Sequence, residues 1–235
     1  MRHVAIVLSA GTGSRMGSSV AKQYMMIGDK PIIYFALKAF QESFVDEIVL
    51  VCGADDVDFV KKDIVDAFGF SKVKSIVKGG AERYLSVMNG LNACEDADYI
   101  YIHDGARPFV SGEVLHRAKK CVEGYGTAIA AVSVKDTIKS VDNNGVILDT
   151  PDRSTLRIIQ TPQAFEKALI TKAYNALKAD IEGDRLGDLK ITDDAMVVEH
   201  YCLQEVHVFE GDYGNIKVTT PDDLDYMRFR LTADE

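Results

Sequence analysis

Apolar residues fall in short, strand-sized runs that alternate with longer segments of helical periodicity. The first run, His3 to Leu8, is continuously apolar and is closed by Ser9-Ala10-Gly11, which is typical of a strand buried on both faces. Similar patterns predict strands over residues 47–51, 73–77, 99–102 and 128–134, and helices after Pro31, from Asp55 or Asp56 to Phe68, and over residues 83–94, 115–122, 164–177, 193–201 and 221–231. This alternation predicts an α/β fold with a doubly wound, mostly parallel sheet covered on both faces.

The pattern changes after residue 134, where two short β-prone pieces flank Asp142-Asn143-Asn144-Gly145. The Asn-Gly pair indicates a hairpin turn. Two strands alone are marginally stable in water, so the hairpin is expected to rest on the body or on a second copy of the chain. We therefore predict a single domain over residues 1–235 with a β-arm at residues 134–159, exchanged across a twofold axis. Residues 180–190 are polar, contain two glycines and are predicted to form a mobile loop.

Composition narrows the class of protein. The 235 residues include 36 acidic and 27 basic side chains, a net charge of −9, which argues against a general nucleic-acid binder. The longest apolar runs are far shorter than the ~20 residues of a membrane helix, so no membrane association is expected. The four cysteines form no Cys-x-x-Cys pair, so neither a zinc site nor a disulfide framework is indicated. The first strand leaves no room for a leader segment, and the cytoplasm is the expected location.

The first loop, Ser9 to Gly17, has the small residues that let backbone N–H groups approach an anion. Its glycine spacing fits neither the Gly-x-Gly-x-x-Gly dinucleotide fingerprint nor a P-loop. What remains is a glycine loop with two cations, Arg15 and Lys22, that could bracket a polyphosphate and neutralise charge developing on it. An ordinary strand–helix turn with two solvated basic residues is the alternative.

Two later loops also follow predicted strands, at the sheet end that carries ligands in this architecture. Gly79-Gly80 begins a second glycine-started helix entry, so the two glycine loops could face one crevice. The alternative is an ordinary turn and helix in which Glu82 and Arg83 are solvent charges. Asp104 could hold a hydrated divalent cation with Arg107 bracing it, although a structural Asp–Arg ion pair is common at turns. His103 has no histidine partner at metal-ligand spacing and is interpreted either as a packing residue or as one that supports neighbouring site residues.

The third group of candidates lies in the last third of the chain. Thr161 and Thr192 offer hydroxyls, and Arg153 and Lys217 offer charge, the combination that a phosphomonoester requires. Helix capping is the alternative for Thr192, and also for the threonines before Pro221. None of these residues is decisive alone.

Taken together and in order, these segments resemble the 2-C-methyl-D-erythritol 4-phosphate cytidylyltransferase family. The resemblance covers nearly the whole chain, and the agreement of separate segments in order is far more specific than one glycine pattern. The segments are Ser9 to Gly17, Lys22, Gly79-Gly80 with Glu82-Arg83 and Ser86, His103 to Pro108, Asp136-Thr137, Asp152-Arg153, Gln160 to Gln163, Thr192-Asp193 and Asn215 to Thr220.

The resemblance implies transfer of a cytidylyl group from CTP to a sugar-alcohol phosphate, with release of pyrophosphate. It also implies a Rossmann-like nucleotidyltransferase fold, a Mg²⁺ ion and a homodimer whose β-arm reaches the neighbouring site. Two residues would be catalytic, Arg15 and Lys22, by stabilising the pentavalent α-phosphorus and the leaving pyrophosphate. The implied nucleotide-binding residues are Ser9, Ala10, Gly11, Thr12, Gly13, Gly80, Ser86, Asp104, Gly105 and Arg107, with Asp104 also contacting the metal. The implied acceptor-binding residues are Thr137, Thr161, Thr192, Lys217 and, from the other subunit, Arg153.

The chain departs from the family pattern at Ser9, where relatives often carry alanine, and at Ala81, where an acidic residue is common. Residues 180–190 are also longer than expected. The nearest alternative is a ribitol-5-phosphate cytidylyltransferase, which resembles this family in fold, nucleotide loop and chemistry. A catalytically silent nucleotide-binding regulatory module is the alternative from another class, and the glycine spacing disfavours a nicotinamide-dependent oxidoreductase.

Overall fold

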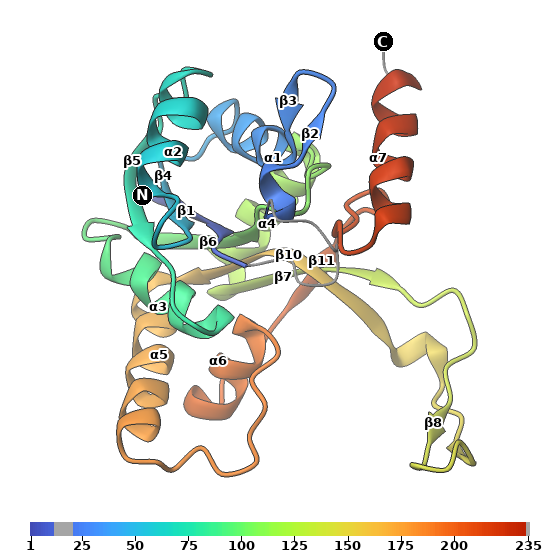
Figure 1. Cartoon of the computed structure of the whole chain (residues 1–235). Coiled ribbons are helices and arrows are strands. Elements are labelled where there is room, and N and C mark those ends of the chain that lie inside the picture. Colours follow the sequence, from blue (N-terminus) through green and yellow to red (C-terminus); the bar gives the residue numbers. More distant parts are fainter. Residues whose placement is uncertain (12–20, 234–235) are drawn as a thin grey trace.

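A seven-stranded sheet forms the centre of the computed structural model, which describes residues 1–11 and 21–233 (Figure 1). The strand order is β11-β7-β10-β6-β1-β4-β5. Among these strands, β10 alone runs antiparallel to its neighbours, which confirms a mostly parallel sheet. The strands are β1 (His3–Ser9), β4 (Glu47–Cys52), β5 (Val73–Lys78), β6 (Tyr99–Asp104), β7 (Thr127–Ser133), β10 (Arg157–Glu166) and β11 (Val208–Glu210).

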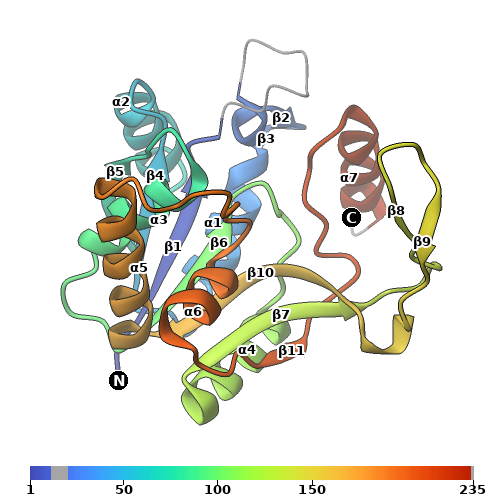
Figure 2. The same cartoon turned by 90° about the horizontal axis from the view of Figure 1, so that it is seen from below.

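Helices cover both faces of the sheet, as Figures 1 and 2 show from two directions. One face packs against α1 (Ile32–Gln41), α4 (Gly112–Tyr125) and the continuous helical segment α2 (Val57–Phe59) with η3 (Val60–Asp66). The other face packs against α3 (Arg83–Asn92), α5 (Lys167–Glu182) and α6 (Asp194–Cys202). The last helix, α7 (Pro221–Ala233), packs through Leu224 and Met227 in a smaller apolar cluster. The doubly wound α/β fold is therefore confirmed.

Strand β1 shows why an unbroken apolar run belongs at the centre of this sheet. Its side chains alternate between faces, so Ala5 and Val7 pack with α1 and α4, whereas Val4 and Ile6 pack with α3 and α5. All four are at most 2% exposed. A strand covered on both sides has no polar face, and periodicity of two disappears from its sequence.

The structure corrects two predicted helices. The helix predicted from residue 164 begins only at Lys167, because residues 164–166 still belong to β10, where Ala164 and Phe165 are fully buried between β6 and β7. The helix predicted from Asp55 or Asp56 changes from α to π geometry at Val60, and the Asp56 side chain accepts no capping hydrogen bond.

Other short elements were not predicted. They are β11, the hairpin of β2 (Met26–Ile27) and β3 (Lys30–Pro31), and the 3-10 turns η2 (Lys22–Tyr24) and η4 (Arg153–Thr155). Strand β10 was not predicted either, since Pro162 interrupts its pattern. The pairing register with β7 shifts between Ile159 and Gln163, and this irregularity accommodates the proline.

The predicted hairpin is present and extends away from the body (Figures 1 and 2). Its strands β8 (Ser140–Val141) and β9 (Ile147–Asp149) pair with each other and with no other strand in the described part of the chain. β10 pairs with β7 from Arg157 onward, so residues 157–159, which the sequence assigned to the arm, belong to the main sheet. The apolar side chains of Val146, Ile147 and Leu148 are 58%, 58% and 67% exposed in a single copy of the chain.

Across residues 1–11 and 21–233, no helix combines the length and apolar character that crossing a membrane requires.

Candidate active site

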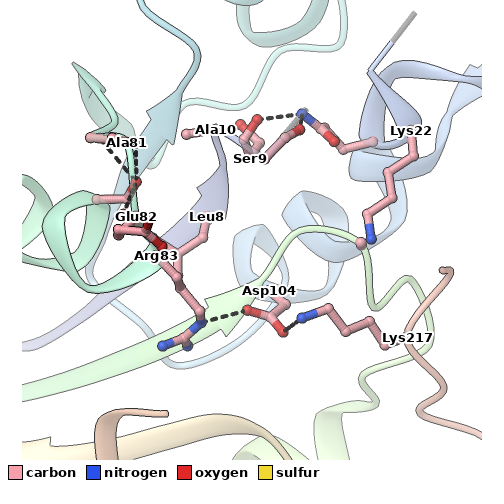
Figure 3. A pocket seen from close by; sticks show the side chains of 14 residues that line it. Leu8, Ser9, Ala10, Lys22, Ala81, Glu82, Arg83, Asp104 and Lys217 are labelled. Carbon is pink, nitrogen blue, oxygen red and sulfur yellow. Dashed lines mark hydrogen bonds and ion pairs between the residues drawn. The ribbon is translucent and has the colours of Figure 1, made fainter. Parts of the chain in front are cut away.

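A cavity of about 390 Å³ opens at the carboxyl ends of β1, β5 and β6 (Figure 3). It is lined by both glycine loops and by charged residues from three further segments. This edge is where open α/β sheets bind ligands, and the prediction that the two glycine loops face one crevice is confirmed. The described lining residues are Leu8, Ser9, Ala10, Gly11, Lys22, Gln23, Gly80, Ala81, Glu82, Arg83, Ser86, Asp104, Ala106 and Lys217.

The start of the first loop is held by the 3-10 turn that follows it. The Gln23 side chain donates hydrogen bonds to the carbonyls of Ser9 and Gly11, the second at 3.0 Å. The Ser9 hydroxyl donates to the Val51 carbonyl at 2.9 Å. Lys22 begins the same turn, and its side chain extends into the space that Asp104 and Lys217 also face (Figure 3). The hydrogen bonds of Gln23 therefore tie the turn that carries Lys22 to the start of the first loop.

The second loop requires both of its glycines, Gly79 for close approach to the first loop and Gly80 for close approach to α3. A Cβ atom on Gly79 would lie 2.2 Å from Cβ of Ala10, and one on Gly80 would lie 2.3 Å from Cβ of Leu85. The Gly80 N–H donates to the Ser86 hydroxyl at 3.0 Å, which closes the loop on the first turn of α3. The backbone at the cavity wall is therefore left without side chains that could block a ligand.

Asp104 lies at the centre of a cluster of cations. Its Oδ2 is 2.7 Å from Nζ of Lys217, its Oδ1 is 3.3 Å from Nε of Arg83, and Nε of Arg107 is 4.0 Å away. Burial alone would raise the pKa of Asp104, but Arg83, Lys217 and Arg107 outweigh burial and hold that pKa well below its usual range. The carboxylate is therefore ionised at neutral pH.

A second cavity of about 290 Å³ adjoins the first across this cluster. Arg83, Asp104 and Lys217 line both cavities, so they form a shared charged wall. The remaining lining residues are Arg107, Ile159, Gln160, Thr161, Gln163, Thr192 and Asp193. The structure thus brings the predicted acceptor residues Thr161, Thr192 and Lys217 to one cavity. Of the two residues predicted on the nucleotide side, Asp104 lines both cavities, whereas Arg107 lines the second and not the first.

The start of α6 is fixed from three sides, which places Thr192 at the second cavity. Asp193 caps the helix by accepting the Met196 N–H at 3.0 Å, so the interpretation of Thr192 as the cap is wrong. Gln163 Oε1 accepts the backbone N–H groups of Asp194 and Ala195, each at 3.0 Å. The fully buried carboxylate of Asp194 accepts hydrogen bonds from both Nη atoms of Arg83, at 2.9 and 2.7 Å.

Arg83 and Asp194 are the main features that sequence reasoning missed. The interpretation of Arg83 as a solvent charge is wrong, because it bridges Asp104 at the end of β6 and Asp194 at the start of α6. The sequence signal was its position in the first turn of α3, directly after the second glycine loop. For the threonines before Pro221, Asp223 rather than either hydroxyl accepts the free N–H groups, at 2.8 Å each.

The packing interpretation of His103 is confirmed. The imidazole is fully buried, lies 3.0 Å through Nδ1 from the Thr161 hydroxyl and 3.1 Å through Nε2 from the Arg107 carbonyl, and meets the Phe40 ring edge-on. Burial lowers the pKa of His103 to about 4.

We therefore expect His103 to make folding stability pH-dependent. The unfolded chain binds a proton at His103 below about pH 6.5, whereas the folded chain binds it only near pH 4, so stability falls as the pH drops through this window. The loss is about 3 kcal/mol, since each pKa unit corresponds to about 1.4 kcal/mol. Urea unfolding of the wild type and His103→Gln at several pH values measures it. Equal pH slopes in the two proteins would contradict the assignment, and the comparison cancels the contribution of His3, whose pKa burial also lowers.

Several predicted residues are not at either cavity. Thr137 and Arg153 are exposed on the arm, where Arg153 donates to the Lys135 carbonyl at 3.0 Å. Gly105 supports the site from behind, since its N–H donates to the Leu8 carbonyl at 2.8 Å and a Cβ atom there would lie 2.9 Å from that oxygen. The predicted residues Thr12, Gly13 and Arg15 lie outside the described residues.

Comparisons with known proteins agree with this geometry. The sequence model of the family described as 2-C-methyl-D-erythritol 4-phosphate cytidylyltransferase (IspD) matches residues 3–233. A protein of that name from Lachnoclostridium phytofermentans is 47% identical over 220 residues, 94% of this chain and 92% of the relative. One from Clostridium perfringens is 45% identical over 222 residues, 94% and 95% of the two chains. The crystal structure of 4-diphosphocytidyl-2C-methyl-D-erythritol synthase from Anaerococcus prevotii superimposes with a TM-score of 0.85 at 31% identity, covering 98% of this chain and 96% of the other.

Proposed function

The chain belongs to the 2-C-methyl-D-erythritol 4-phosphate cytidylyltransferase family, and on that premise we propose how its two cavities carry out the reaction. The enzyme transfers the cytidylyl group of CTP to 2-C-methyl-D-erythritol 4-phosphate and releases pyrophosphate. CTP occupies the cavity with the glycine loops, and the acceptor phosphate occupies the adjoining one. The observation that carries this assignment is the shared wall of Arg83, Asp104 and Lys217, because a group passing between two substrates must cross such a boundary.

The reaction asks the protein for positioning and charge neutralisation. In-line attack at phosphorus needs no protein nucleophile, and the acceptor phosphate is already a nucleophile at neutral pH, so no general base is required. We assign the backbone of residues 9–11 and 80 with Ser86 to the nucleotide. Lys22, together with Arg15, stabilises the pentavalent α-phosphorus and the leaving pyrophosphate. Lys217 and Thr192 face the acceptor phosphate from the second cavity.

The Mg²⁺ ion that the family resemblance implies would find carboxylate donors in the first cavity. Its two acidic lining residues among the described ones are Glu82 and Asp104, and the structure describes no cluster of three or more His, Cys, Asp or Glu side chains that could hold a metal. Mg²⁺ is commonly bound by one or two carboxylates together with substrate phosphates. Asp104 is ionised, as a metal ligand must be, and we assign it as the protein ligand. When bound with CTP, the ion supplies neutralisation of phosphate charge.

We further propose that two copies exchange their arms in a homodimer. The support is the row of exposed apolar residues on a hairpin that contacts little of its own body, since burying them requires another surface. In that arrangement Arg153 and Thr137 of one subunit complete the acceptor cavity of the other.

We also propose that each chain acts as a single domain. Its four cysteines are free thiols, which fits the reducing environment of the cytoplasm.

Complementation between two inactive variants tests the arm exchange. We expect Lys22→Ala and Arg153→Ala to be inactive separately but to recover roughly a quarter of wild-type activity after subunit mixing, because half of the dimers then hold one site with both residues intact. Recovery is measured as pyrophosphate release from a 1:1 mixture, with sedimentation confirming exchange. No recovery in fully exchanged dimers would place Arg153 in the site of its own chain, and an active monomer would exclude the exchanged arm.

Pyrophosphate release across CTP, ATP, GTP and UTP, each with 2-C-methyl-D-erythritol 4-phosphate or ribitol 5-phosphate, tests the function itself. The proposal requires the highest kcat/KM with CTP and the methylerythritol acceptor. A preference for ribitol 5-phosphate would reassign the acceptor, and no release with any pair would indicate a silent nucleotide-binding module.

A further inference from the structure

A closed circuit of hydrogen bonds lies beneath the shared wall of the two cavities. The Thr161 hydroxyl and Nδ1 of His103 are 3.0 Å apart, and Nε2 of His103 is 3.1 Å from the Arg107 carbonyl. Arg107 Nη1 donates to the Asn215 carbonyl at 2.8 Å, and Asn215 Nδ2 donates to the Thr161 carbonyl at 2.8 Å. The side chains of His103 and Asn215 are fully buried, and Thr161 is 4% exposed.

The direction of each hydrogen bond follows from its chemistry. The Arg107 carbonyl can only accept, so the imidazole proton sits on Nε2. The imidazole is fully buried and its two hydrogen-bond partners, the Thr161 hydroxyl and the Arg107 carbonyl, are both uncharged, so burial keeps it neutral and Nδ1 is an acceptor. The single hydroxyl proton of Thr161 is therefore donated to Nδ1. The Thr161 oxygen in turn accepts the Asp104 N–H at 3.1 Å.

The Thr161 hydroxyl consequently has no proton left for a ligand. An unprotonated phosphate oxygen offers lone pairs and needs a donor, which Thr161 cannot supply while this circuit is closed. We propose that Thr161 is a positioning residue, and that with His103 and Asn215 it sets the positions of Asp104 and Lys217 instead of binding the acceptor phosphate.

The circuit reaches both members of the shortest ion pair in the shared wall. Thr161 holds the backbone of Asp104 directly, while Asn215 anchors the start of the segment that carries Lys217. The Val218 N–H, on the other side of Lys217, donates to the Ala106 carbonyl at 2.8 Å. Lys217 therefore projects from a segment fixed at both ends to the same turn that presents Asp104. Displacing that pair by about 1 Å can cost as much as 100-fold in rate.

Two substitutions and one control separate positioning from phosphate binding. Thr161→Val keeps the shape but removes the hydroxyl, Thr161→Ser keeps the hydroxyl, and Thr192→Val removes the hydroxyl that we assign to the acceptor. We expect Thr161→Val to lower kcat and to lower kcat/KM for CTP and for the acceptor alike, by about 10- to 100-fold, with recovery in Thr161→Ser. Thr192→Val should chiefly raise the acceptor KM.

Amide hydrogen exchange gives a readout that needs no catalysis. In Thr161→Val the Asp104 N–H loses its acceptor and should exchange about tenfold faster than in the wild type and in Thr161→Ser, measured by NMR without substrates. Unchanged exchange at Asp104, or a rise in the acceptor KM alone, would overturn the positioning role. The kinetic expectation rests on the proposed function, and a wild-type protein that releases no pyrophosphate would refute that function. The hydrogen-exchange result would still test the hydrogen-bond circuit, because it is measured without substrates.

Discussion

Lys22→Ala is expected to reduce turnover by about 10²- to 10³-fold while changing the CTP KM much less. Lys22 lies at the wall of the nucleotide cavity on a turn fixed to the first glycine loop, and its side chain extends toward the boundary with the acceptor cavity. Negative charge that builds up on the phosphates during transfer is greatest in the transition state. A cation held in place for that moment therefore contributes more to kcat than to substrate binding.

Single-turnover measurements with saturating CTP and acceptor give the chemical rate directly. Lys62→Ala is a matched control, because Lys62 is exposed on η3 and lies at neither cavity. The control should react at the wild-type rate. A Lys22→Ala protein with near-normal single-turnover rate and weakened CTP binding would assign Lys22 to ground-state binding.

Asp194→Ala is expected to cause the largest loss of stability, about 3 kcal/mol. Asp194 is fully buried, accepts both Nη atoms of Arg83, and also accepts the Tyr174 hydroxyl at 2.6 Å. Its removal leaves the buried Tyr174 hydroxyl without that acceptor and Arg83 without one of two carboxylates. We expect a loss near the lower end of the range for broken buried ion pairs. The Arg83 side chain is 29% exposed, so water can solvate it, and it still forms its ion pair with Asp104.

Urea unfolding of Asp194→Ala, with Asp188→Ala as the exposed control, measures this difference. The control should lie within about 0.5 kcal/mol of the wild type. We also expect the acceptor KM to rise in Asp194→Ala, because the start of α6 presents Thr192. A destabilisation no larger than that of the control would contradict this expectation. It would mean that the Arg83–Asp194 ion pair adds nothing to the free energy of unfolding.

The sequence predicted those parts of the fold that local patterning controls. The continuous apolar run of β1 and the stripe of α1 require burial wherever they lie, and the Asn-Gly turn of the arm fixes its own geometry. It did not predict β10, whose polar and proline-containing centre has strand geometry because β6 and β7 pair with its two edges. The strand geometry of β10 is therefore set by its neighbours β6 and β7 and not by its own sequence pattern.

The candidate site shows the same division. Glycine loops and ordered motifs identified most residues of the two cavities, since loops after parallel strands meet at one edge. The connection from Arg83 to Asp194 spans 111 positions and depends on how α3 and α6 pack on the same face of the sheet. No local spacing encodes such a contact. The direction of the Thr161 hydroxyl likewise depends on a histidine that the sequence places on another strand.

The shared wall has a consequence for inhibitor design. A molecule that fills both cavities must pass Arg83 and Lys217 and must also avoid desolvating the Asp104 carboxylate without replacing its contacts. A neutral scaffold at this point offers Arg83 and Lys217 no charged acceptor in place of the water that it displaces. Bisubstrate mimics of this enzyme therefore need an anionic linker, such as a phosphonate, at the point where they cross from one cavity to the other.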